Sequence, residues 1–169
     1  MSKRLLVLRH AKSSWAEEGT TDHDRKLNKR GKRTAPKVGE WLVEQQVLPD
    51  IVFCSTAKRA AETAQLVTQP FEHPYSVEFM RELYLAPAST YVEIASTHGG
   101  DASCVLMIGH NPGIESLASY LIGEGVSFPT AAYLDAEFDV DNWQALSLDQ
   151  CRQQLTTAPQ VWRPKEQLD

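Results

Sequence analysis

Leu5-Leu6-Val7-Leu8-Arg9-His10 decides the fold, because four consecutive apolar residues give way abruptly to two that carry functional groups. An apolar run without polar alternation is typical of a strand that is buried on both faces of a mostly parallel sheet. Two later stretches, Ile51 to Cys54 and Cys104 to Ile108, repeat this pattern. The sequence therefore predicts three buried strands near the centre of one sheet.

Helical periodicity fills the intervals between these strands. Asn28 is a suitable N-cap for a first helix, although Pro36 should kink that helix or delay its regular start. Ser55 or Thr56 is expected to cap a second helix, and Pro87 to open a third. Alternating strands and helices predict an α/β fold, in the form of a three-layer sandwich with a mostly parallel central sheet flanked by helices.

The pattern changes toward the C-terminus. Residues 132–140 alternate between apolar and polar types, which predicts a half-exposed strand, and Trp143 to Leu146 is expected to pair with it antiparallel. Thr156 to Asp169 has few apolar residues and is expected to be loosely attached. A chain of 169 residues suits one compact core, so we expect a single domain over residues 1–169.

Composition excludes several classes of protein. A net charge of -5 argues against nucleic acid as the main ligand, because such binding depends on a basic surface. The apolar runs are far shorter than the roughly 20 residues that a membrane-spanning helix needs. Three widely spaced cysteines fit neither a disulfide framework nor a zinc site, so we expect a reducing, cytoplasmic location and no membrane partner.

Basic residues gather between Arg25 and Lys37, inside a chain that is acidic as a whole. Such a stretch is most often the solvated face of a helix. The alternative is a docking surface for an acidic partner.

Functional groups follow all three predicted buried strands. In parallel sheets ligands bind beyond the carboxyl ends of the strands, so Arg9-His10, Ser55 to Arg59 and Gly109-His110 can converge on one cleft. Arginine offers a planar fork of donors that matches phosphate oxygens. A neutral histidine can attack phosphorus, and a second histidine can stabilise the charge on the moving phosphoryl group.

Other interpretations of these side chains stay open. Taken singly, each of the four is more often structural than catalytic. A metallohydrolase with His10 and His110 as ligands is disfavoured because no acidic residue accompanies either one at ligand spacing. A non-catalytic module that captures a phosphoprotein is a further alternative.

Three motifs, in this order along the chain, resemble the histidine phosphatase superfamily. Its SixA-type phosphohistidine phosphatase branch is the most similar, through residues 9–15, 24–31 and 129–132. The three motifs are Leu8-Arg9-His10-Ala11, Ser55-Thr56-Ala57-Lys58-Arg59-Ala60 with Glu62-Thr63-Ala64, and Gly109-His110-Asn111-Pro112.

The resemblance implies a phosphoglycerate-mutase-like fold and a phosphohistidine intermediate on His10. It further implies a phosphate pocket of Arg9, Arg59 and His110, and no metal or other cofactor. Many members of the superfamily have glycine after the nucleophile, whereas this chain has Ala11, a substitution that the SixA-type branch shares. The expected substrate is a protein phosphohistidine, and the alternative is a small phosphorylated metabolite hydrolysed by the same mechanism.

Three further residues are candidates for the site. Glu82 lies near the position where larger relatives carry an acid, although an exposed glutamate at a strand end is the more ordinary interpretation. Lys12 and Ser13 could bind phosphate from the loop after His10, or serve that loop alone. About 50 residues separate Arg59 from His110, which leaves no room for a large inserted lid and predicts an open pocket.

Overall fold

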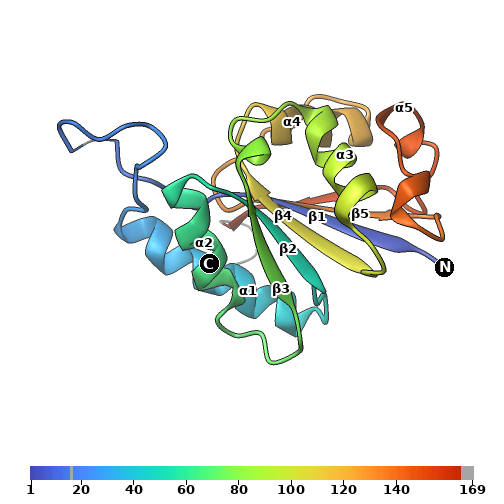
Figure 1. The fold of residues 1–169 in the computed structure, drawn as a ribbon, viewed down its shortest axis with the longest axis horizontal. Helices are drawn as coiled ribbons and strands as arrows, with labels where there is room; N and C mark the ends of the chain where they lie inside the picture. The colour runs from blue at the N-terminus through green and yellow to red at the C-terminus, as the bar shows by residue number, and fades with distance from the viewer. Residues whose placement is uncertain (16, 165–169) are drawn as a thin grey trace.

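The structure, a computed structural model, describes residues 1–15 and 17–164. Strands and helices alternate through most of this range, as the apolar pattern of the sequence predicts (Figure 1). The elements are β1 (Lys3–Arg9), α1 (Lys29–Glu44), β2 (Ile51–Ser55), α2 (Lys58–Thr68), β3 (Ser76–Met80), η1 (Arg81–Leu83), α3 (Ala88–His98), β4 (Cys104–Gly109), α4 (Gly113–Ile122), β5 (Tyr133–Phe138), η2 (Trp143–Ala145), α5 (Leu148–Cys151) and β6 (Gln160–Trp162).

Six strands form one sheet in the order β3-β2-β4-β1-β5-β6. The first four strands of this order run parallel to one another, while β5 and β6 are each antiparallel to their neighbours. In the register of β1 and β4, Arg9 faces Gly109. The carboxyl ends of these two strands therefore coincide at one edge of the sheet.

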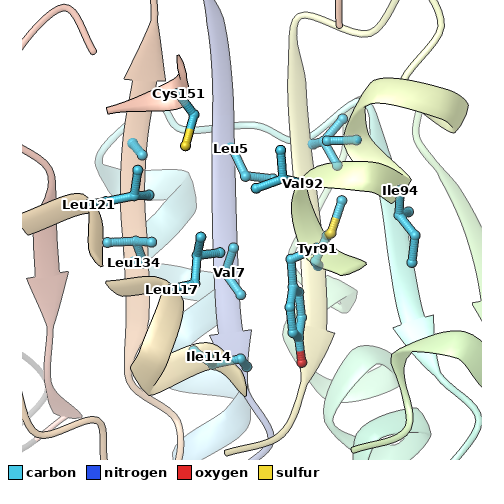
Figure 2. Close-up of a cluster of buried hydrophobic side chains, with 14 of the residues drawn as sticks. Leu5, Val7, Tyr91, Val92, Ile94, Ile114, Leu117, Leu121, Leu134 and Cys151 are labelled. Carbon is cyan, nitrogen blue, oxygen red and sulfur yellow. The ribbon is translucent and has the colours of Figure 1, made fainter. Parts of the chain in front are cut away.

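The sheet is the middle of three layers, with α1 and α2 on one face and α3, α4 and α5 on the other (Figure 1). Strand β1 is buried on both faces because Leu5 and Val7 pack toward α3 and α4, while Leu6 and Leu8 pack toward α1 and α2. Figure 2 shows Leu5 and Val7 among the buried side chains on the face of the sheet that α3 and α4 cover. The predicted α/β sandwich with a mostly parallel sheet is confirmed.

Local signals in the sequence fix most of the helix ends. The side chain of Asn28 accepts a hydrogen bond from the backbone N–H of Gly31 and caps α1 as expected. Helix α1 begins at Lys29 and continues through Pro36, so the prediction of a delayed start is wrong. Helix α2 begins later than predicted, at Lys58, with Ala57 as its N-cap. Ser55 nevertheless accepts a hydrogen bond from the N–H of Ala57.

The C-terminal part of the chain differs from the prediction. Trp143–Ala145 forms a short 3-10 helix, and the antiparallel partner of β5 is β6 instead. The ring of Trp162 in β6 stacks on the ring of Tyr133, with centroids 6.3 Å apart. The expected loose attachment of Thr156 to Asp169 is therefore wrong for Gln160–Trp162, while residues 165–169 lie outside the described residues.

No helix within residues 1–15 and 17–164 combines the length and the apolar character that crossing a membrane requires.

Candidate active site

The carboxyl ends of three parallel strands, β1, β2 and β4, bring His10, Arg59 and His110 together, as the topology predicts. His10 follows β1 directly and His110 follows β4, and the backbone N–H of His10 donates to the carbonyl of Gly109 at 3.1 Å. The two imidazole centroids lie 5.1 Å apart. Arg59 comes from the first turn of α2, beyond the end of β2, and its Nε lies 3.3 Å from Nε2 of His10.

The hydrogen bonds of His10 fix the tautomer of its imidazole. Nδ1 lies 2.8 Å from the carbonyl oxygen of Ala11, which can only accept, so Nδ1 carries the hydrogen. Nε2 then holds a lone pair, which accepts from the Nε–H of Arg59. Burial, together with the charges of Arg59 and Arg9, lowers the pKa of His10 to about 3. The imidazole is therefore neutral, with a lone pair on Nε2.

Arg59 is held almost entirely inside the protein, with 3% of its surface exposed. Its Nη1 donates to the backbone oxygen of Asp22 at 2.6 Å, and its Nη2 to the carboxylate of Asp22 at 3.2 Å. Together with the bond from Nε to His10, these contacts hold the guanidinium beside the nucleophile at three nitrogens. A planar fork fixed in this way is suited to binding a phosphoryl group.

His110 lies among groups that leave one of its ring nitrogens without a partner. Nε2 shares a hydrogen bond of 2.8 Å with the hydroxyl of Ser55 at the end of β2. Nδ1 is buried and has no hydrogen-bond partner among the described residues. Burial, together with the neighbouring His10 and Arg59, lowers the pKa of His110 to about 3. His110 is thus a second neutral imidazole with one nitrogen available to a ligand.

Arg9, the last residue of β1, also has a nitrogen without a protein partner. Its Nη1 donates to the backbone oxygen of Phe128 at 3.0 Å, while its buried Nε has no partner among the described residues. Buried polar atoms are normally hydrogen-bonded, and exceptions indicate strain or an absent ligand. Arg9 and His110 thus each carry one buried nitrogen without a hydrogen-bond partner among the described residues.

The structure separates the three remaining candidates. Lys12 is exposed and lines a cavity beside Arg9. Ser13 is buried, and its hydroxyl accepts from Nη2 of Arg25 at 2.6 Å, which ties it to the loop. Glu82 lies exposed in η1. Among the described residues, it forms no hydrogen bond or ion pair with the side chains of Arg9, His10, Arg59 and His110.

Two residues that the sequence analysis missed complete the site. Tyr84, just after η1, donates from its hydroxyl to the carboxylate of Asp22, and its ring meets that of His110 edge-on with centroids 5.5 Å apart. The hydrogen bond from Tyr84 and the charge of Arg59 hold the pKa of the Asp22 carboxyl below its usual range. Asp22 is therefore an ionised carboxylate that is bound to Arg59. It lies in a loop without periodicity, so no sequence pattern locates it.

Within the described residues there is no group of three or more histidine, cysteine, aspartate or glutamate side chains that could hold a metal ion. The acidic residue at the site, Asp22, is occupied by Arg59 and Tyr84.

The sequence and the fold match known proteins. Residues 5–84 match the model of the histidine phosphatase superfamily, branch 1. A solved structure named for the phosphohistidine phosphatase SixA of Agrobacterium tumefaciens is 30% identical and has a TM-score of 0.73, over 79% of this chain and 91% of that one. The chain belongs to the histidine phosphatase superfamily.

Two further relatives of this histidine phosphatase are matched over nearly their whole length. A protein of Mycobacterium leprae with no assigned function is 32% identical over 84% of this chain and 93% of its own. The structure named for SixA of Nakamurella multipartitia covers 97% of both chains with a TM-score of 0.81 and 24% identity, which supports the fold. The resemblance derived from the sequence motifs is confirmed, and the superfamily's phosphatase and mutase chemistry is the activity class of this chain.

Proposed function

We propose that this histidine phosphatase hydrolyses phosphohistidine on proteins, without a metal, through a covalent phosphohistidine on His10. The observation that carries the proposal is the tautomer of His10, whose Nε2 lone pair faces Arg59 while Nδ1–H is held by the carbonyl of Ala11. A nucleophile that is already deprotonated needs no base to activate it.

The phosphoryl group binds among Arg9, Arg59 and His110. Arg59 Nε–H moves its hydrogen bond from His10 Nε2 to a phosphoryl oxygen, which frees the lone pair for attack. In one tautomer of the neutral ring, Nε2 of His110 accepts a hydrogen bond from the Ser55 hydroxyl. Nδ1 then carries the ring's hydrogen and donates a hydrogen bond to a second phosphoryl oxygen. These donors stabilise charge on the phosphoryl group as it transfers.

The reaction then takes two steps. The substrate's phosphohistidine ring is protonated at its second nitrogen. The bond from His10 Nε2 to phosphorus forms as the substrate's phosphorus–nitrogen bond breaks, and the substrate ring leaves as a neutral imidazole. A water molecule next attacks the phosphorus, the bond to Nε2 breaks, and inorganic phosphate leaves with His10 neutral again. Both steps conserve the proton count of the enzyme.

The absence of a suitable acid favours a phosphoramidate substrate. Asp22, the carboxyl group beside the site, is held ionised by Tyr84 and Arg59, so it has no proton to give. Glu82 is exposed, and the proposal gives it no role. Expelling an alkoxide requires a proton from the enzyme, whereas a phosphohistidine ring that already carries a proton on its second nitrogen leaves as a neutral imidazole. Small phosphomonoesters are therefore the second candidate substrates.

Rapid-quench labelling tests the proposal. We mix the enzyme with a labelled phosphohistidine peptide and denature it within the first turnover. The expected result is protein-bound label that is stable in alkali, lost in acid and missing from His10→Ala. The second expectation is faster turnover of the phosphohistidine peptide than of a phosphoserine peptide with the same sequence, unchanged by a chelator. Turnover without label at any quench time, or equal rates on the two peptides, contradicts the proposal.

A further inference from the structure

A second cluster of positive charge lies against the proposed site, and three of its four cations have no role in the two steps above. Arg9, Lys12, Arg30 and Arg163 line one cavity of about 400 Å³, together with Pro129 and Thr130 on its rim. Below, it is called the Arg30 cavity. None of the described residues that line it is acidic.

The four cations come from separate parts of the chain. Lys12 lies in the loop after His10, Arg30 in the first turn of α1, and Arg163 directly after β6. Arg163 donates to the backbone oxygen of Ser127 at 3.0 Å. The fold thus gathers at one place the charges of three separate segments of the chain.

The backbone fixes the position of the cavity relative to the nucleophile. The carbonyl of Lys12 accepts a hydrogen bond from the N–H of Asn28, the residue that caps α1, so the Lys12 loop and the start of α1 are joined. The N–H of Ala131, the residue after the cavity-lining Thr130, donates to the carbonyls of Arg9 and His10. Arg9 therefore serves both the cavity and the site of His10.

Four cations around a space of this size repel one another, in a chain whose net charge is -5. The side chains of Arg30 and Lys12 form no hydrogen bond or ion pair with the described residues. Arginine stays charged at every accessible pH, so the repulsion cannot be relieved by loss of a proton. An anion in the cavity would relieve it, and a carboxylate forms two parallel hydrogen bonds with an arginine fork.

We infer that the Arg30 cavity binds an acidic side chain of the substrate protein, close to its phosphohistidine. The inference rests on the proposed function, because it requires a protein substrate at His10. It also gives part of the basic stretch from Arg25 to Lys37 a specific role, since Arg30 lines the cavity while Arg33 on the same helix does not.

Two matched peptides test the inference. Both carry phosphohistidine, one flanked by glutamates and the other by glutamines at the same positions. The wild-type enzyme is expected to have a KM for the glutamate peptide about tenfold lower, as one charged hydrogen-bonded pair would give. Arg30→Glu is expected to remove this preference, and Arg30→Gln to reduce it.

Arg33→Glu is the matched control. It makes the same charge change, one turn along the exposed face of α1, outside the cavity. Arg33→Glu should keep the preference for the glutamate peptide. Equal KM values for the two peptides in the wild type, or an equal loss of preference in Arg30→Glu and Arg33→Glu, would overturn the inference, since the second result would indicate only a general surface charge.

A binding measurement separates this inference from the proposed function. The same peptides with a stable phosphohistidine analogue are titrated into the wild type and Arg30→Glu by calorimetry. If neither phosphohistidine peptide is hydrolysed, the proposed function fails, and the Kd values alone decide whether the cavity recognises an acidic side chain. If both are hydrolysed but the Kd values of the analogues do not depend on Arg30, only the cavity inference fails.

Discussion

The hydroxyl of Thr63 accepts a hydrogen bond at 3.1 Å from the backbone N–H of Ala11, the residue that follows the nucleophile. The same hydroxyl donates to the carbonyl of Arg59 at 2.7 Å. One buried side chain of α2 thus connects the loop of His10 to the helix turn that carries Arg59. The distance from Arg59 to His10 depends on this connection.

Thr63→Val keeps the shape of the side chain but leaves the N–H of Ala11 without a partner. We expect a loss of about 1–3 kcal/mol in the free energy of unfolding, because the N–H is buried, together with a lower kcat. Urea denaturation and steady-state kinetics measure the two effects. Thr68→Val is the control, since the buried hydroxyl of Thr68 bonds only to carbonyls within α2. Equal effects of the two substitutions would contradict a specific role for Thr63.

Substitution of Arg59 or His110 tests whether each stabilises the transferring phosphoryl group. Arg59→Ala and His110→Ala are each expected to lower kcat by about 100- to 1,000-fold, the effect of removing one donor to a developing charge. Arg59→Lys should remain strongly impaired, because an ammonium cannot reproduce the planar fork. Single-turnover phosphate release measures these rates. A loss below about tenfold would remove that residue from the proposed pocket.

The two buried histidines make stability depend on pH. The pKa values of His10 and His110 are lowered to about 3 in the folded protein, against about 6.5 in an unfolded chain. Between these values the unfolded chain binds protons that the folded protein does not. The two histidines therefore make their full contribution to the free energy of unfolding above about pH 6.5. This contribution falls as the pH drops toward about 3, by at most about 1.4 kcal/mol per pH unit for each histidine.

Denaturation of the wild type and of His10→Gln at about pH 7 and about pH 5 measures this dependence. Carboxylates with lowered pKa values, such as Asp22, contribute to both proteins and cancel in the comparison. The variant should lose less stability on acidification than the wild type. Identical losses would show that His10 titrates normally in the folded protein.

Gly31 provides a test of the loop that carries Lys12. A Cβ atom at Gly31 would lie 2.2 Å from the carbonyl oxygen of Lys12, so Gly31→Ala must displace the backbone two residues after the nucleophile. We expect a loss of about 1–3 kcal/mol in stability and a reduced kcat. At Gly125 the added Cβ meets nothing within 4 Å, which makes Gly125→Ala the matched control. Equal thermal unfolding and activity of the two variants would contradict the close approach.

The parts of the fold that the sequence predicted correctly are those with strong local patterns. The apolar run of Leu5 to Leu8 can be satisfied only at the centre of a covered sheet, and a histidine directly after such a strand must lie at the sheet's edge. This reasoning placed His10, Arg59 and His110 together. By contrast, Gln160–Trp162 is too short to show a period, and its pairing with β5 depends on the stacking of Trp162 on Tyr133.

The residues of the site that were missed depend on geometry rather than on pattern. Asp22 lies in a loop, and its position follows from hydrogen bonds to Arg59 and Tyr84 that no periodicity encodes. The segment around Glu82 was correctly singled out, but the 3-10 turn Arg81–Leu83 exposes Glu82 and brings Tyr84 to His110. A prediction based on nearness in sequence could not distinguish two residues that are two positions apart.

The place of β1 in the sheet has a consequence for how the protein is made. Its two neighbours are β4 and β5, so that Arg4 pairs with Cys104 on one side and with Glu137 on the other. During synthesis, His10 leaves the ribosome early but cannot be oriented until both later strands have emerged. Contacts this distant along the chain also form slowly, and the apolar strand remains open to aggregation in the meantime. The nascent chain thus carries its proposed nucleophile long before the surrounding site can form.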